Sequence, residues 1–309
     1  MKKLLIICYG ILLFAYALPP VNAVFRHSIG VADEGGRSVE ALIGGKKESL
    51  SMSEYLTGVL AAEMPASFEE EALKAQAVAA RSYALYCLQS GKHGGRVCTD
   101  PGCCQAYMDA SQRRKRWGGD SLKYERRLLN AVNATAGEIL RYKGEPVQAV
   151  FHASSYLCTE SSAELWGELP YLVSVSSPES PETVPGLFST VELTAEELKN
   201  AVENAHPEAA FPEDAQSWIG DVERDASGRV KRLSIAGAEL SGRELRSLFL
   251  LRSTAFELSY ADGKFLFAVT GFGHGVGMSQ QGANVMARQG ADYTAILAHY
   301  YPSTTLCKD

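Results

Sequence analysis

The stretch AAEMPASFEEEALKAQAVAARSYAL, residues 61–85, sets one carboxylate, Glu63, two positions ahead of a proline and then continues as an alanine-rich run. Ser67 and Glu70 have the spacing of a capping box, which predicts the start of a helix over residues 68–89. The apolar positions of this helix share one face, and the small alanines favour close packing against a neighbouring element. We therefore expect a long buried helix, with Glu63 just before its first turn.

Short strands and helices alternate along the rest of the chain without a regular βαβ order. Alternating apolar and polar runs joined by a turn predict hairpins over residues 137–154, 228–240 and 256–271. Helical spacing of apolar residues predicts further helices over residues 122–134, 194–205, 241–249 and 280–301. The predicted fold class is therefore α+β, with mixed helices and short antiparallel hairpins forming subdomains around a substrate cleft.

The proline-rich stretch SSPESPETVPG, residues 176–186, is the clearest linker in the chain. It divides residues 24–309 into a first part, 24–175, which carries Glu63 and a Cys/His loop, and a second part, 187–309, which carries a glycine-rich loop. We expect the two parts to build one domain around a shared site.

The first 23 residues have the order of an export segment: Lys2 and Lys3, an apolar run over residues 4–18, and small residues up to Ala23. Cleavage after Ala23 would release a secreted protein, whereas an uncleaved segment would anchor the chain in the membrane. The residues alone leave both alternatives open, and both predict an extracytoplasmic protein.

The chain of 309 residues has a formal net charge of −6, with 46% hydrophobic and 21% charged residues, which is the composition of a globular protein. A nucleic-acid partner requires a basic surface, because the phosphate backbone dominates the affinity. The acidic balance therefore argues against nucleic acid as a partner.

Four soft metal ligands fall within twelve residues of the stretch KHGGRVCTDPGCCQAY: His93, Cys98, Cys103 and Cys104. Their number and type suit a tetrahedral structural zinc. The alternative is a disulfide between Cys103 and Cys104, since disulfides are the default outside the cytosol. The pattern gives Cys307 no role, and it gives Cys158 only the less favoured alternative of a thiol peptidase nucleophile with His152.

Glu63 is the candidate for an acid/base group, because the other residues of the stretch 60–64 are apolar. A carboxyl group held among apolar side chains has its pKa raised by desolvation, as a general acid near neutral pH requires. The alternative is a carboxylate that only complements a helix dipole, as expected for residues 69–71.

Two further stretches could bring polar side chains to a ligand: FHASSYLCTE, residues 151–160, and GFGHGVGMSQQGA, residues 271–283. Their alternatives are a polar strand face and a tight structural turn. We expect a substrate-binding set from these stretches to face Glu63 across one groove: His152, Ser154, His274, Ser279 and Gln280. Arg81, roughly four turns into the helix after Glu63, joins this set, more as a brace of the cleft than as a sugar contact.

Several of these segments together resemble the family of stage II sporulation protein D and the amidase enhancer of autolysins: EYLTGVLAAEMP, EALKAQAVAARSYAL, CQAY, FHASS, LSGRELRSLFLLRSTAF and GHGVGMSQQGANVMARQG. The resemblance runs from about residue 25 to the last few residues. It implies a lytic transglycosylase that cleaves peptidoglycan glycan strands at N-acetylmuramic acid, leaving anhydro-muramyl ends, during forespore engulfment. Glu63 stands at the family's catalytic position, and catalysis needs no cofactor.

The resemblance also implies partners: glycan strands free of stem peptides, a sporulation amidase with its membrane complex, and the membrane itself through the N-terminus. Zinc held by His and Cys in the loop before CQAY is implied as well, although Cys103 stands where some members have His. Tyr156, Leu157 and Cys158 replace the usual small, glycine-rich stretch. The alternative function within the same family is a non-catalytic, wall-binding enhancer of an N-acetylmuramoyl-L-alanine amidase.

Overall fold

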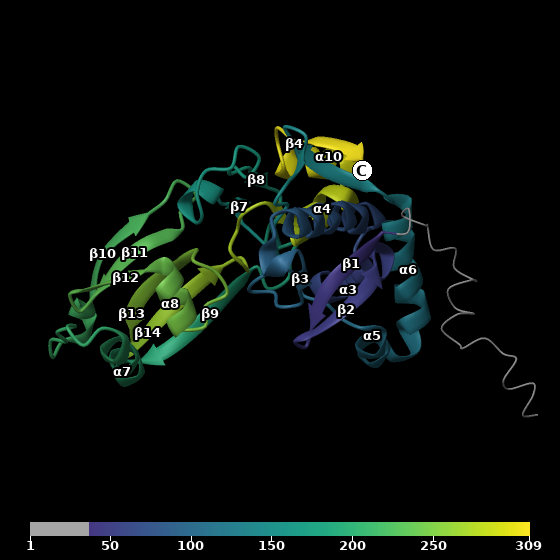
Figure 1. The fold of residues 1–309 in the computed structure, drawn as a ribbon. Coiled ribbons are helices and arrows are strands. Elements are labelled where there is room, and N and C mark those ends of the chain that lie inside the picture. The colour runs from purple at the N-terminus through teal and green to yellow at the C-terminus, as the bar shows by residue number, and fades with distance from the viewer. Residues whose placement is uncertain (1–36) are drawn as a thin grey trace, which may run out of the picture.

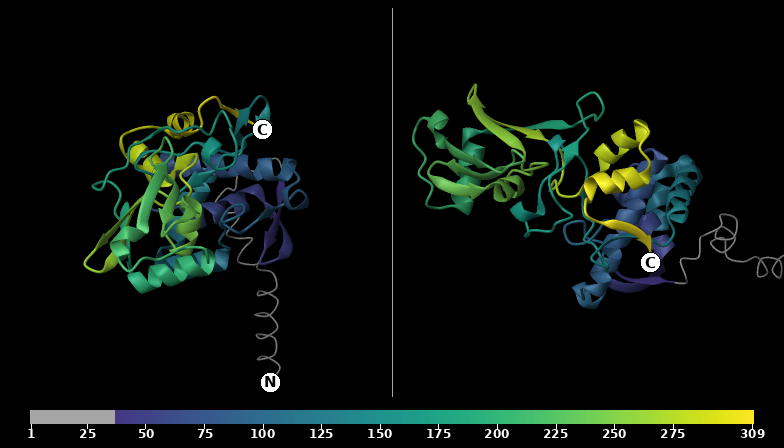
Figure 2. Two further views of the ribbon diagram at one scale, coloured as in Figure 1. Left: turned by 90° about the vertical axis from the view of Figure 1, so that its left-hand side faces the viewer. Right: turned by 90° about the horizontal axis from the view of Figure 1, so that it is seen from above.

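The structure is a computed structural model in which residues 37–309 are described, and its fold is α+β, as predicted. The chain forms two lobes, each with a hydrophobic core of its own (Figure 1). Figure 2 shows the same two lobes from the side and from above. No helix within residues 37–309 is both long and apolar enough to cross a membrane. The predicted export segment, residues 1–23, lies outside the described residues.

The first lobe is built around α4 (Glu70–Gln89), the helix predicted from the alanine-rich run. Most of its residues are buried, because α3 (Met52–Glu63), α6 (Ser121–Ala134), α9 (Gln280–Arg288) and α10 (Tyr293–Tyr300) pack against it. The interaxial distance of packed helices depends on the side chains at the contact, and alanine keeps that distance short.

The capping box predicted at the start of α4 does not form. The N-cap residue is Glu69, whose side chain makes no capping hydrogen bond. Instead, the Glu69 backbone N–H donates to the Asn284 Oδ1 in α9 at 2.9 Å. The prediction from Ser67 and Glu70 was therefore wrong, because a partner far along the chain completes this helix end.

The helix α3, which the sequence did not predict, ends at Glu63. Its last turn is closed by the Met64 N–H, which donates to the Leu60 carbonyl at 3.0 Å. Pro65 follows, and a proline disfavours the helical conformation of the residue before it. Glu63 is therefore the last residue of one helix rather than a loop residue before the next.

The first lobe also contains several small β-sheets. The strand β1 (Ser38–Ile43) pairs antiparallel with β2 (Lys46–Ser51) and parallel with β3 (Val97–Cys98). The predicted hairpin over 137–154 is shorter than expected, because only β4 (Glu138–Tyr142) and β5 (Glu145–Pro146) pair. The other elements of this lobe are α5 (Ala110–Trp117), β6 (Phe151–His152), β7 (Leu157–Cys158), β8 (Ser176–Ser177), β15 (Met278–Ser279), β16 (Thr305–Lys308), η1 (Lys92–Gly94), η2 (Gly118–Asp120) and η3 (Ser162–Glu164).

The second lobe contains two three-stranded sheets and two helices, and its predicted helices and hairpins are confirmed within a few residues. The Trp218 and Phe265 rings stack in its core with centroids 5.5 Å apart. Its elements are β9 (Phe188–Thr194), α7 (Ala195–Ala205), η4 (Ala215–Trp218), β10 (Ile219–Arg224), β11 (Val230–Ile235), β12 (Ala238–Ser241), α8 (Gly242–Leu248), β13 (Phe256–Ala261) and β14 (Lys264–Thr270).

After β14 the chain returns to the first lobe, where β15 pairs parallel with β6. The residues of α9 and α10 therefore join the first core, so the cores divide the chain differently from the predicted parts 24–175 and 187–309. Within the predicted linker 176–186, Glu179 is buried and accepts from the Ser155 N–H at 2.9 Å. The role of that segment as a linker between domains stays a prediction.

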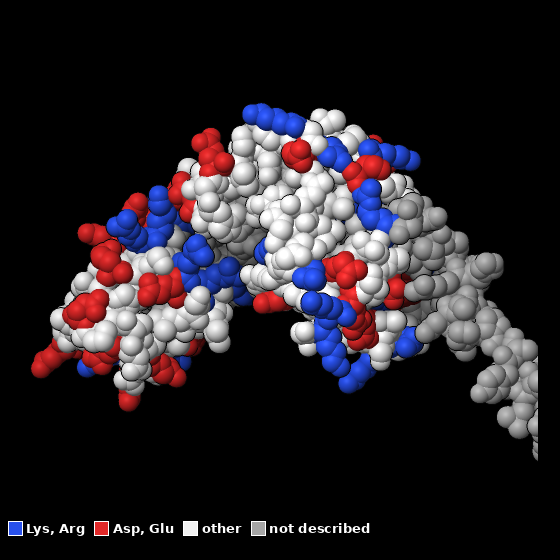
Figure 3. Space-filling view, viewed as in Figure 1, with Lys and Arg blue, Asp and Glu red and all other residues white. Residues whose placement is uncertain are grey.

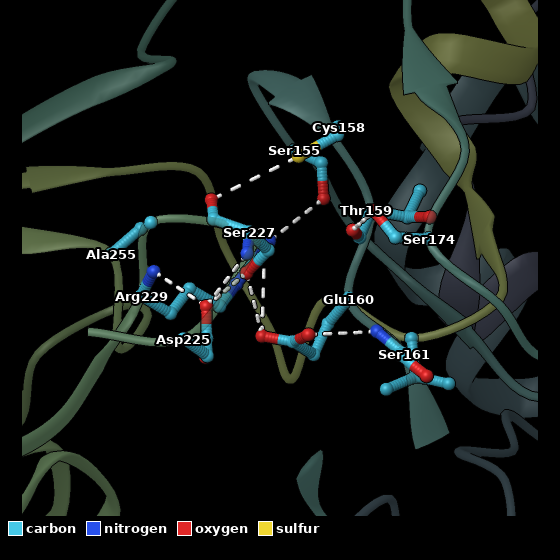
Figure 4. Close-up of polar contacts among 12 residues, drawn as sticks. Ser155, Cys158, Thr159, Glu160, Ser161, Ser174, Asp225, Ser227, Arg229 and Ala255 are labelled. Atoms are coloured by element: carbon cyan, nitrogen blue, oxygen red, sulfur yellow. Dashed lines mark hydrogen bonds and ion pairs between the residues drawn. The ribbon is translucent and has the colours of Figure 1, made fainter. Parts of the chain in front are cut away.

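A buried polar network joins the lobes (Figure 4). The Ser227 Oγ lies 2.7 Å from both the Glu160 Oε2 and the Asp225 Oδ1, and Arg229 Nη1 donates to the same Oγ at 3.0 Å. One hydroxyl proton cannot serve two ionised carboxylates, so the second contact needs a proton on a carboxyl group. Burial, and then the neighbouring Asp225, raises the pKa of Glu160 to about 7, which makes Glu160 the holder of that proton.

The Glu160 proton makes stability depend on pH. Between pH 4.5 and about 7 the folded chain keeps a proton that the unfolded chain has lost, so the free energy of unfolding falls as pH rises through this window. Glu160→Gln removes the carboxyl group that titrates in this window. The decrease in the free energy of unfolding between pH 4.5 and about 7 should therefore be smaller by about 2–3 kcal/mol in the variant, since one pKa unit corresponds to about 1.4 kcal/mol. Urea unfolding of both proteins at a series of pH values measures this difference.

Glu145→Gln, at an exposed position in β5, controls for the loss of one negative charge. If the free energy of unfolding depends on pH in the same way for the wild type and for Glu160→Gln, Glu160 does not hold the proton of the network.

Candidate active site

A cleft of about 660 Å³ lies between the two lobes and contains the predicted acid. Its walls come from the end of α3, residues 101–106 and residues 150–153 of the first lobe, and from α8 of the second lobe. Figure 3 shows the surface hollowed at this position, with Lys and Arg side chains gathered on the side of the second lobe that faces the hollow.

Glu63 stands partly exposed in the wall of this cleft. Its Oε1 accepts a hydrogen bond from the Ala106 backbone N–H at 2.8 Å. Burial raises the pKa of Glu63, and this shift outweighs the opposing effects of the Ala106 N–H and of Gln280. The Gln280 side chain faces the carboxyl group, although its Nε2 makes no hydrogen bond of ordinary geometry in the described chain. The raised pKa favours the protonated form of Glu63, which is the form that can donate a proton.

Among the described residues that line the cleft, Glu63 is the only Asp or Glu. Other carboxyl groups with raised pKa values, Glu160 and Glu179, lie outside the cleft lining and are held by serine hydroxyls. The cleft therefore offers one carboxyl group rather than a pair.

The two histidines in the cleft are neutral. His152 Nδ1 lies 3.2 Å from the Val276 carbonyl and must donate to it, so its Nε2 accepts from the Ser155 hydroxyl at 2.6 Å. His274 Nδ1 accepts from the Val276 N–H at 3.1 Å. Burial lowers the pKa of His152 well below its usual value, and burial together with the Arg246 charge lowers the pKa of His274 to about 4. These imidazoles shape the cleft as neutral polar groups.

The structure brings part of the predicted substrate-binding set to Glu63. His152, His274 and Gln280 line the same cleft as Glu63. The Trp166 ring packs on His274, with centroids 5.3 Å apart. The strand β6 and the glycine-rich loop therefore both contribute to the lining of the cleft.

Three other residues of the predicted set do not line the cleft. Ser279 is buried and caps α9, and its hydroxyl donates to Glu179. Ser154 is buried beside a backbone bridge to Phe272. Arg81 is 1% exposed and donates to the Val132 and Glu138 carbonyls at 3.3 and 3.1 Å. Local polarity suggested ligand contacts for Ser154 and Ser279 and a bracing role for Arg81. In the structure, protein groups take up the hydrogen bonds of Ser279 and Arg81, and Ser154 is buried.

Four residues of the cleft were missed from the sequence. Trp166 and Phe272 are 47% and 42% exposed, which is unusual for aromatic side chains, and both line the cleft. Arg243 and Arg246 line it from α8. Their spacing of three residues on a predicted helix was the available signal, because residues three apart share one face.

The structure also brings together the predicted metal ligands. The ligand atoms of four residues lie within 4.8 Å of one another: His93, Cys98, Cys103 and Cys104. One imidazole and three thiols at such distances match the donor set of structural zinc. All cysteines within residues 37–309 are free thiols, so the structure contains no Cys103–Cys104 disulfide.

The alternative pair of Cys158 and His152 is not formed. The Cys158 thiol points to the Ser227 carbonyl, with a sulfur–oxygen distance of 3.8 Å. The ring nitrogens of His152 are bonded to Ser155 and Val276 instead. Cys307 lies in β16 and packs against the core of the first lobe.

Comparison with known proteins finds a family described as Stage II sporulation protein over residues 45–142, and a domain of unknown function over residues 188–277, the span of the second lobe. The chain is 37% identical to stage II sporulation protein D of Bacillus amyloliquefaciens, over 82% of this chain and 73% of that protein. It is 34% identical to stage II sporulation protein D of Bacillus subtilis, over 84% of this chain and 75% of that protein. It is 28% identical to the amidase enhancer of Bacillus subtilis, over 81% of this chain and 40% of that protein. The chain therefore belongs to the stage II sporulation protein D family, a family of sporulation proteins, and the amidase enhancer is a more distant relative.

Proposed function

We propose that this protein is a lytic transglycosylase that cleaves peptidoglycan glycan strands at N-acetylmuramic acid during sporulation. The observation that carries the proposal is the single carboxyl group, Glu63, in the lining of the cleft. Most glycosidases that use water need two carboxyl groups across the scissile bond. One suffices when the substrate's own hydroxyl is the nucleophile, because the same residue can donate one proton and then accept another.

In the proposed reaction, protonated Glu63 donates its proton to the glycosidic oxygen, and the bond from that oxygen to C1 of N-acetylmuramic acid breaks. The C6 hydroxyl oxygen of the same sugar then forms a bond to C1, while Glu63 accepts the hydroxyl proton. The products are a 1,6-anhydro-muramyl end and a free hydroxyl on the departing sugar. No water is consumed, and Glu63 is again protonated for the next cycle.

The surroundings of Glu63 support these roles. The Ala106 N–H fixes one carboxyl oxygen, and therefore orients the other oxygen. Trp166 and Phe272 place exposed aromatic side chains in the cleft lining, which suits packing against the apolar faces of sugar rings. The Gln280 Nε2, which makes no hydrogen bond of ordinary geometry among the described residues, offers a donor to a hydroxyl near Glu63.

The alternative is a non-catalytic enhancer that presents the wall to an amidase, in keeping with the name of the 28% identical relative. Such a protein would use the same cleft for binding without needing the acid. Under both alternatives we place the protein outside the cytoplasm, held by its N-terminal segment and working with a sporulation amidase and its membrane complex.

Glu63→Gln separates the two functions. The amide cannot donate the proton, so release of anhydro-muropeptides should fall by at least about 100-fold while glycan binding and folding are kept. Digestion of purified glycan strands, followed by mass spectrometry of the products, measures this. Glu48→Gln, on the exposed strand β2, is the matched control and should stay active.

Full activity of Glu63→Gln would refute its assignment as the acid. A wild-type protein that binds strands but leaves no anhydro ends would favour the enhancer instead.

We also infer that the cluster of His93, Cys98, Cys103 and Cys104 holds a structural zinc ion. When bound, zinc would tie the loop after α4 to β3 and to the segment that leads to Ala106. The ion is not needed for the proton transfers described above.

Elemental analysis should find about one zinc per chain in protein purified without added metal. Cys98→Ser should lose the metal and lower the melting temperature by about 10 °C, because a structural zinc contributes several kcal/mol to folding. Cys158→Ser, outside the cluster, should keep both metal and melting temperature. A metal-free protein with a Cys103–Cys104 disulfide found by peptide mass spectrometry would refute the inference.

A further inference from the structure

Two arginines of α8, Arg243 and Arg246, face the cleft from the second lobe. They are three residues apart, so both side chains leave the same face of the helix. Among the described residues lining the cleft they are the only Lys or Arg. The wall of the cleft that belongs to the second lobe is therefore cationic, in a chain whose formal net charge is −6.

Neither arginine has a carboxylate partner within the described residues. Arg246 Nε donates to the Leu251 carbonyl at 3.3 Å, which leaves the two terminal nitrogens of the guanidinium for another group. Arg113 in the first lobe, for comparison, forms an ion pair with Glu125 at 2.6 Å. The α8 pair differs in that its charges are directed into a cleft rather than to a protein anion.

The two charges also repel each other. Burial, and then the charge of Arg243, lowers the pKa of Arg246. The field of Arg246 reaches the first-lobe wall, since it contributes to the lowered pKa of His274. An anion bound between the guanidinium groups would relieve this repulsion and form charge-assisted hydrogen bonds.

The substrate assigned above offers one such anion. Its sugars are neutral, but N-acetylmuramic acid carries a lactyl group that ends in a carboxylate when no stem peptide is attached. When a stem peptide is attached, the same carbon is part of a neutral amide. A guanidinium group binds a carboxylate through two parallel hydrogen bonds and by opposite charge. A neutral amide offers only one oxygen acceptor and no charge.

We propose that Arg243 and Arg246 form a carboxylate subsite that binds the free lactyl group of N-acetylmuramic acid and thereby selects strands without stem peptides. This inference rests on the proposed function for the identity of the ligand. It gives a defined role to the second lobe, which matches a domain of unknown function, because that lobe supplies the two arginines of the cleft that contains Glu63.

The test is a binding experiment on the non-cleaving Glu63→Gln protein, with two probes. One is a peptide-free muramyl oligosaccharide with lactyl carboxylates, and the other is the same oligosaccharide with each carboxylate converted to a primary amide. We expect the carboxylate probe to bind about 10- to 100-fold more tightly by calorimetry, the range for charged hydrogen bonds. Adding Arg243→Gln and Arg246→Gln should remove this preference, while the Kd of the amide probe changes little.

The matched control carries Lys199→Gln and Arg232→Gln, which remove two positive charges from exposed positions of the second lobe outside the cleft. It should keep the preference. Equal loss of affinity for both probes in the α8 variant, an unchanged preference, or no binding of the carboxylate probe would each overturn the subsite. Because no cleavage is measured, a failed transglycosylase assay with an intact preference would refute the proposed reaction and leave the subsite standing.

Discussion

The close approach of residues 106–108 to α3 is the contact on which the site depends. Gly58 makes it possible, since a Cβ there would lie 2.1 Å from the Tyr107 ring and 2.8 Å from the Met108 carbonyl oxygen. The Met108 N–H donates to the Gly58 carbonyl at 3.0 Å, and one turn further along α3 the Ala106 N–H reaches Glu63. Any side chain at residue 58 would push this segment away and remove the Ala106 hydrogen bond that fixes the Glu63 carboxyl group. The same segment begins at the His/Cys cluster, so that cluster and the acid share one short piece of backbone.

The second constraint is the path of the chain between the lobes. The second lobe is inserted between β8 and β15, and the parallel pairing of β15 with β6 returns the chain beside His152. Arg229 of the second lobe then reaches Ser155 with a nitrogen–oxygen distance of 3.2 Å, and Ser155 is the partner of His152. The orientation of the second lobe and the position of one cleft histidine are therefore fixed by the same buried network.

Sequence patterns predicted the parts of this arrangement that depend on neighbours in the chain. The helix α4, the hairpins of the second lobe and the gathering of His93 with the three cysteines all follow from spacing within about twenty residues. The features that the sequence patterns did not predict depend on contacts between residues far apart in the chain. Asn284 caps α4 in place of Ser67, and Ser279 turns to the buried Glu179. A polar residue that faces a cleft and one that meets a buried partner have the same sequence pattern. Arg81 was therefore placed at the cleft, while Arg243 and Arg246 of the correctly predicted α8 were missed as cleft residues.

The position of the α8 arginines also explains how the cleft can be cationic while the pKa of Glu63 stays raised. A cation close to a carboxyl group stabilises its charged form and lowers its pKa. The pKa of Glu63 is shifted by burial, by Ala106 and by Gln280, and no arginine contributes to the shift. The charge of Arg246 acts instead on His274, which it helps to keep neutral. Placing the positive charge on the second lobe lets the cleft be cationic without lowering the pKa of Glu63, the residue that donates the proton in the proposed reaction.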